Sequence, residues 1–149
     1  MILISHRGNI NGRLVPFENQ PNYIDTAIAA GYDVEIDVWY EIESGKLYLG
    51  HDKADYQIDI DWLDERSDKL WIHCKNMDSL SYFNKINTFG PEYNYFSHDK
   101  DMGVLTSYGY IWSTNLYDNG ILVLPEVFEK TPIETTIGIC SDIIQNYKK

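Results

Sequence analysis

Short apolar runs, each bounded by turn residues, divide the chain into a series of predicted strands and helices. The runs predict eight strands, over residues 2–5, 33–40, 46–50, 70–74, 93–97, 109–113, 121–124 and 137–141. Apolar residues at helical spacing predict helices over residues 23–30, 59–66 and 77–86, and a final short helix over residues 142–147. Strands that alternate with helices in this way are typical of a parallel sheet.

Two local features bear on how these elements connect. Asn76 directly precedes the helix over residues 77–86 and is its expected N-cap, because asparagine accepts hydrogen bonds from the first helical turn. Only residues 114–120 separate the sixth and seventh strands, whereas a parallel crossover normally needs about a dozen residues. This connection is therefore an irregular loop, or the two strands are not parallel.

The polar residues on two predicted strands occupy positions that share a face. Glu35 and Asp37 project together, opposite the apolar residues of their strand, because successive strand residues face opposite sides of a sheet. His73 and Lys75 share a face of another strand in the same way. Two neighbouring carboxylates repel each other, and a divalent cation removes that repulsion. Carboxylate oxygens suit Mg²⁺ or Ca²⁺.

Four further polar residues directly follow strands. His6 and Arg7 lie at the end of the first strand, and His51 and Asp52 follow the third. The carboxyl ends of strands gather on one face of a barrel or of an open α/β sheet, and sites form on that face. We therefore expect the histidines, the carboxylates, the arginine and the lysine to converge there.

Each of these residues also has an ordinary structural explanation. A single carboxylate at a strand end is usually solvated, and a single histidine is more often a hydrogen-bonded surface residue than a catalytic one. Lys75 is an ion-pair partner of Glu35 or Asp37 if it has no role in binding. His98 belongs to a loop, or it supplies an extra ligand or a proton carrier.

The charge of the chain narrows the functions that such a site could have. The 149 residues include 12 basic and 23 acidic side chains, which gives a formal net charge of −11. The chain lacks the excess of lysine and arginine that binding to nucleic acid or to an anionic membrane surface needs. An anionic substrate would need a locally positive pocket within this repulsive field.

The sequence also indicates where the protein resides. It has no pattern typical of a secretory signal, and no apolar run approaches the roughly 18 residues of a membrane span. We expect a cytoplasmic protein with one domain over residues 1–149. Cys74 and Cys140 are then reduced and buried rather than joined in a disulfide.

Four short motifs follow one another along the first 52 residues of the chain. They are His6-Arg7-Gly8, Glu18-Asn19, Glu35-Ile36-Asp37-Val38 and His51-Asp52. Together they resemble the glycerophosphodiester phosphodiesterase family, which belongs to the phospholipase C-like phosphodiesterase superfamily. Residues 16–19 look like the family's Pro-Glu-Asn-Thr turn, residues 71–75 like its Glu-x-Lys strand, and residues 138–142 like its closing Gly-x-x-Thr-Asp segment.

The resemblance implies a fold. It predicts an α/β protein, a compact TIM-type (β/α)8 barrel with several helices reduced to loops, especially in the C-terminal half. Such barrels typically take about 250 residues, so 149 residues leave little room for helices. A pared-down barrel exposes apolar strand surface, and we therefore expect a homodimer that covers it.

The resemblance also implies a role for each matching residue. His6 and His51 form the acid/base pair, Arg7 and Lys75 bind the phosphate, and Glu18 orients the first loop.

The implied metal ligands are Glu35, Asp37 and His73, of which His73 takes the place of a third acidic ligand. The expected cofactor is a divalent metal ion, Mg²⁺ or Ca²⁺ in the first place. Mn²⁺ and Zn²⁺ are alternatives, because imidazole suits transition metals and zinc better.

The sequence thus predicts a hydrolase that cleaves a small glycerol- or sugar-phosphodiester by histidine acid/base catalysis with metal assistance. The alternative is a non-catalytic protein that binds phosphate esters on a degenerate phosphodiesterase barrel. The aromatic residues Trp39, Tyr48, Tyr56 and Trp112 stack on the substrate or pack in the core, and Arg13 adds positive charge near the pocket.

Overall fold

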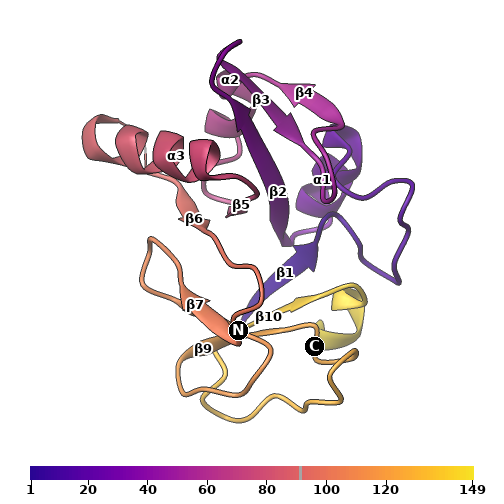
Figure 1. Ribbon diagram of the computed structural model, residues 1–149. Helices are drawn as coiled ribbons and strands as arrows, with labels where there is room; N and C mark the ends of the chain where they lie inside the picture. Colours follow the sequence, from indigo (N-terminus) through magenta and orange to yellow (C-terminus); the bar gives the residue numbers. More distant parts are fainter. Residues whose placement is uncertain (91) are drawn as a thin grey trace.

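The computed structural model describes residues 1–90 and 92–149, and its strands form one strongly curled sheet (Figure 1). The strands are β1 (Ile2–His6), β2 (Asp33–Glu41), β3 (Lys46–Leu49), β4 (Tyr56–Ile58), β5 (Leu70–Cys74), β6 (Asn94–Phe96), β7 (Gly103–Leu105), β8 (Ile111–Ser113), β9 (Gly120–Val123) and β10 (Gly138–Ser141). The helices are α1 (Pro21–Ala29), α2 (Ile60–Asp64), α3 (Met77–Phe89) and the 3₁₀-helix η1 (Ile144–Tyr147).

Most of the sheet is parallel. The strands β6, β5, β2, β1, β10, β9 and β8 lie side by side in this order and run in the same direction. Three pairs of neighbouring strands are antiparallel. In these pairs, β3 lies along the second half of β2, β4 lies along β3, and β7 lies along β8. The long strand β2 therefore carries β5 on one edge, and β1 followed by β3 on the other.

The prediction of a (β/α)8 barrel is wrong. In the part of the chain that the structure describes, all three α-helices precede β6, and the chain from β6 onward contributes short strands, loops and the 3₁₀-helix η1 (Figure 1). No strand pairing among the described residues joins β6 to β7 or β8, although one backbone hydrogen bond of 2.8 Å links Ser107 to Tyr95. The sheet is curled but open.

Chain length and local sequence explain why the barrel does not form. The connections after β6 are short, and the longest of them, residues 124–137, contains Pro125 and Pro132, which disfavour a helix interior. Residues 114–119 join the parallel strands β8 and β9 as an irregular loop, which settles the alternatives left open for this connection. The periodicity missed β4 and β7, which have three residues each.

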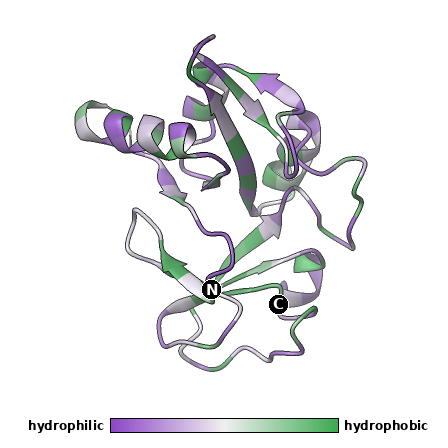
Figure 2. Ribbon diagram, viewed as in Figure 1, coloured by the Kyte–Doolittle hydropathy of each residue, from purple (hydrophilic) through white to green (hydrophobic). Residues whose placement is uncertain are grey.

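Helices cover the outer face of the sheet's first half. Val34, Ile36 and Val38 of β2 and Ile72 of β5 are fully buried there, where they pack with apolar residues of α1, α2 and α3. Figure 2 shows β2 banded by hydropathy, as expected for a strand whose two faces differ. Burial of both faces is typical of parallel sheets.

A second apolar cluster lies on the inner, concave face. It contains Ile4, Trp71, Phe96 and Trp112, which come from four different strands. The indole rings of Trp71 and Trp112 stack with their centroids 5.6 Å apart. This cluster fills one end of the concave face and leaves the other end for polar side chains.

Both cysteines are free and buried. None of the helices among the described residues is long and apolar enough to cross a bilayer. Some apolar side chains are exposed, including Phe89 on α3 and Met102 before β7. The homodimer stays a prediction.

The predicted N-cap of α3 is confirmed. The Asn76 side chain accepts a hydrogen bond of 3.0 Å from the Ser79 backbone, and its amide donates to the carbonyl of Tyr40 at the end of β2. We expect Asn76→Ala to lower the free energy of unfolding by about 1–2 kcal/mol.

The matched control for this cap is Gln20, the N-cap residue of α1, which makes no side-chain capping bond. Gln20→Ala should change the free energy of unfolding by less than about 0.5 kcal/mol. Urea unfolding of the two variants measures the difference. Equal losses would contradict the role given to the Asn76 side chain.

Candidate functional site

A pocket of about 780 Å³ opens on the concave face of the sheet. Six of the residues predicted from the sequence line it: His6, Arg7, Glu35, His51, His73 and Lys75. The other two, Asp37 and Glu18, are buried and contact Arg7 directly. The fold therefore brings all eight predicted site residues together. Four of them lie on β1, β2 and β5, and the other four lie in the connections that follow β1, β3 and β5.

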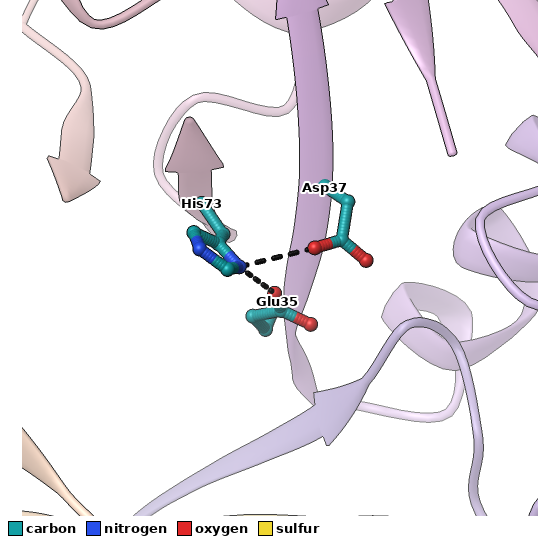
Figure 3. A group of neighbouring side chains, drawn as sticks. All are labelled: Glu35, Asp37 and His73. Atoms are coloured by element: carbon teal, nitrogen blue, oxygen red, sulfur yellow. Dashed lines mark ion pairs between the residues drawn. The ribbon is translucent and has the colours of Figure 1, made fainter. Parts of the chain in front are cut away.

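The carboxylates of Glu35 and Asp37 lie on the same face of β2, and His73 faces them from the neighbouring strand β5 (Figure 3). The Nδ1 atom of His73 is 3.1 Å from Asp37 Oδ1 and 3.7 Å from Glu35 Oε1. One potential ligand atom from each residue lies within 4.8 Å of the others. The parallel register, which pairs Asp37 with His73, creates this arrangement.

Asp37 is fully buried and is surrounded by donors and cations. Its Oδ2 atom is 2.9 Å from Arg7 Nε and accepts a hydrogen bond of 2.9 Å from the Asn19 amide. Its Oδ1 atom is 3.7 Å from Lys75 Nζ. Burial alone would raise the pKa of Asp37, but the imidazoles of His51 and His73 and the charge of Arg7 hold it well below 3.8.

The pKa of Glu35 is shifted in the opposite direction, although Glu35 is only two residues from Asp37 on the same strand. Burial and the negative charge of Asp37 raise the pKa of Glu35 well above 4.5. Its Oε2 atom is buried without a hydrogen-bond partner, and it lies 3.9 Å from His6 Nε2. An unpartnered carboxylate oxygen in such a position is costly for the folded protein unless a ligand occupies the pocket.

The turn after β1 places His6 and Arg7. Arg7 and Gly8 both have positive φ angles, of 57° and 93°, so the chain reverses sharply directly after His6. Only glycine suits the second position, because a Cβ atom there would lie 2.6 Å from the Tyr23 ring. The sharp reversal turns the Arg7 guanidinium toward Asp37.

Asp142 contacts the inner nitrogen of the His6 ring, and no role was predicted for it from the sequence. Its Oδ1 atom is 2.7 Å from His6 Nδ1 and also accepts a hydrogen bond of 2.8 Å from Asn9. Burial raises the pKa of Asp142, but the His6 imidazole and the Asn9 amide outweigh this and lower it below 3.8 overall. Asp142 directly follows a predicted strand, so the rule that identified His6 and His51 could have found it.

Glu18 lies behind Arg7 and fixes it from the other side. Its carboxylate is 3.3 Å from Arg7 NH1, accepts 2.9 Å from Arg13 Nε and accepts 3.1 Å from the Asn9 amide. Arg7 is thus held between Glu18 and Asp37. Arg13 remains half-exposed and does not line the pocket.

His51 reaches the pocket by an unexpected route. The strand before it, β3, is antiparallel to β2 and not parallel, so it runs back alongside β2 and ends beside Asp37. Gly50 has a φ angle of 152°, and a Cβ atom there would lie 1.9 Å from the carbonyl oxygen of Lys53. The His51 Nδ1 atom is 3.6 Å from Asp37 Oδ2, and its side chain is 39% exposed.

His98 belongs to the loop after β6 and also lines the pocket. Its ring stacks on His73 with the centroids 4.5 Å apart and the planes 1° from parallel. Burial, together with the neighbouring His73 and Lys75, lowers the pKa of His98 to about 4. The aromatic wall of the pocket includes Trp39 and Trp112, whereas Tyr48 lines a neighbouring groove.

Comparisons of the chain with protein-family models, with curated proteins and with solved structures give no match. The chemistry of the pocket therefore has to be inferred from its own side chains. They comprise four imidazoles that line the same cavity, two buried carboxylates on one strand, and an arginine and a lysine beside them.

The contacts of Glu18 predict a pH-dependent effect on stability. Burial raises the pKa of Glu18, but Arg13, Asn9 and Arg7 lower it below 4.5 overall, so the unfolded chain takes up its proton at a higher pH than the folded protein. The stability that Glu18 provides is complete above pH 4.5 and is lost as the pH falls through the folded pKa.

We expect Glu18→Gln to lower the free energy of unfolding by roughly 3 kcal/mol at pH 7, and by less at pH 3.5. Glu65→Gln is the control, because Glu65 pairs with Arg66 on the surface and should matter by less than about 0.5 kcal/mol. Urea unfolding at both pH values gives the comparison. A Glu18 effect that does not shrink at low pH would contradict the ion-pair account.

Proposed function

We propose that this protein hydrolyses phosphodiesters, with His6 and His51 as the acid/base pair. The observation that carries the proposal is the pair His6 and Asp142, which presents one imidazole nitrogen to a pocket that His51, Arg7 and Lys75 also line. A phosphodiester is anionic and repels nucleophiles, so cleavage needs positive charge at the phosphate and proton transfer at both oxygens.

We give the base role to His6. The Asp142 carboxylate accepts a hydrogen bond from His6 Nδ1, so this nitrogen carries the proton in the neutral ring. The Nε2 atom then holds a lone pair that faces the pocket. From there it removes the proton from the attacking hydroxyl group, which belongs to water or to the substrate.

His51 is the corresponding acid. Its Nδ1 atom lies 3.6 Å from Asp37 Oδ2, and its Nε2 atom lies 3.5 Å from the Arg7 guanidinium. With a partly exposed side chain, His51 can deliver a proton to the leaving alkoxide. Arg7 and Lys75 lie beside Asp37 at the same pocket and bind the phosphate oxygens.

The two carboxylates on β2 favour a divalent cation in this site. Glu35 and Asp37 are buried on the same face of the strand and repel each other when both are ionised, and a divalent ion between them would offset both charges.

The residues present fit such an ion. Glu35 Oε2 and Asp37 Oδ1 are buried without hydrogen-bond partners, and His73 adds a nitrogen close to both carboxylates. When bound, a divalent cation offsets the charge of the phosphate oxygens and polarises the phosphorus centre.

The walls of the pocket suggest a small substrate with an alcohol or sugar group. Trp39 and Trp112 line the pocket and offer ring faces for stacking. A glycerol- or sugar-phosphodiester meets both requirements, because it joins an anionic phosphate to a compact hydroxylated group.

The direct test is turnover of a phosphodiester panel, with glycerophosphocholine and bis(p-nitrophenyl) phosphate, in the presence of Mg²⁺, Ca²⁺, Mn²⁺ or Zn²⁺. We expect His6→Ala and His51→Ala each to lower kcat by about a thousandfold. The control is Lys53→Ala, a change of an exposed residue close to His51, which should leave turnover unchanged. Wild-type turnover in either histidine variant would overturn the proposal, and binding without any turnover would favour a non-catalytic phosphate-ester-binding protein.

Asp142 is a positioning residue in this scheme, because it acts through His6. Asp142→Asn should lower kcat by about a hundredfold or more and leave KM nearly unchanged, since an amide can stabilise the wrong imidazole tautomer. Asp142→Glu should recover part of the loss, because it restores a carboxylate. Steady-state kinetics of both variants test this, and a change confined to KM would contradict it.

A further inference from the structure

We propose that His73 binds the metal ion through Nδ1, and that this nitrogen makes the site prefer first-row transition ions such as Mn²⁺, Co²⁺ and Zn²⁺ over Mg²⁺ and Ca²⁺. The inference rests on the proposed function for the use of the ion in catalysis. Binding of the ion itself can be measured without turnover.

The hydrogen bond at the far side of the His73 ring determines its tautomer. The Nε2 atom is 3.2 Å from the backbone carbonyl oxygen of His98. A carbonyl oxygen only accepts hydrogen bonds, so Nε2 must carry a proton. In the neutral ring, Nδ1 is then bare, and its lone pair points toward the carboxylates of Glu35 and Asp37. A backbone carbonyl that fixes a histidine in this way is the usual support of a metal ligand.

The ring of His73 is also held in place by its neighbours. Two neighbouring rings stack on it: Phe96 of β6, with its centroid 5.3 Å away, and His98 of the loop after β6, with its centroid 4.5 Å away. Both planes are within 8° of the His73 plane. A ring flip would break the hydrogen bond to the His98 carbonyl, so Nδ1 stays directed at the carboxylates.

The bare Nδ1 atom and the two carboxylates place three potential ligand atoms within 4.8 Å of one another. Glu35 Oε2 and Asp37 Oδ1 are buried without hydrogen-bond partners. A metal ion can accept electron pairs from both carboxylates and from Nδ1 together, which a single proton cannot do.

The donor set determines which metals this position prefers. Two carboxylate oxygens alone suit Mg²⁺, Ca²⁺ and Mn²⁺, and an imidazole nitrogen shifts the preference toward transition ions and zinc. Mg²⁺ in particular prefers oxygen ligands and keeps most of its water. His73 therefore changes the metal preference without a change in the number of ligands.

Pulsed electron paramagnetic resonance of bound Mn²⁺ tests the inference, because a directly bound imidazole gives a nitrogen-14 modulation. The wild-type protein should show it, and His73→Gln should abolish it. The control is His98→Ala, which removes the only imidazole stacked on His73 but keeps the backbone carbonyl that accepts from Nε2. The nitrogen signal should persist in this variant.

Titration calorimetry with the metals alone gives a second readout. His73→Gln should weaken Mn²⁺ binding by about tenfold or more and change Mg²⁺ binding by less than about threefold. His73→Glu should shift the preference toward Mg²⁺, because it restores an all-oxygen site. Circular dichroism establishes that each variant is folded.

The outcomes separate this inference from the proposed function. A nitrogen signal without phosphodiesterase activity would support the metal site and overturn the hydrolase. Activity without a nitrogen signal from bound Mn²⁺, or a signal that persists in folded His73→Gln, would overturn the role of His73. Absence of Mn²⁺ binding to the wild-type protein would overturn it as well.

Discussion

A carboxylate buried completely away from water is the constraint on which the rest of this structure depends. An isolated buried charge is very costly to the folded state, so Asp37 has to be surrounded by cations and donors. Arg7, Asn19 and Lys75 supply them, and they come from the turn after β1, the loop before α1 and the end of β5. Asp37 thus fixes the relative positions of most of the pocket.

Because the sheet is curled but open, its concave face leaves room for a pocket beside this buried charge. Helices cover the outer face of β2 and β5, and the inner face is shared between an apolar cluster and the polar pocket. After β6 the described chain forms short strands, loops and the 3₁₀-helix η1, and residues of this part complete the pocket. Trp112 and His98 line the pocket from this part of the chain, and Asp142 contacts His6.

The local sequence pattern predicted correctly the features that depend on one residue or one strand. Alternation along residues 33–38 predicted that Glu35 and Asp37 would share a face, and the asparagine before α3 predicted its cap. Whether the sheet closes into a barrel or stays open could not be predicted, because this depends on long-range strand pairing that no single segment specifies. His51 shows the same limit: it reaches the pocket because β3 turns back along β2, and not because its strand is parallel. The contacts of Asp142 and His98 depend on strands that meet only after folding.

A crystal structure of the protein with Mn²⁺ and a non-hydrolysable phosphonate diester tests the central claim most directly, namely that the charges assembled around Asp37 form a metal-assisted phosphodiester site. The account predicts anomalous scattering from manganese between Glu35, Asp37 and His73 Nδ1, with phosphonate oxygens on Arg7 and Lys75 and with His6 Nε2 facing the phosphorus atom. A phosphonate bound elsewhere, with no manganese at these three residues, would contradict the account.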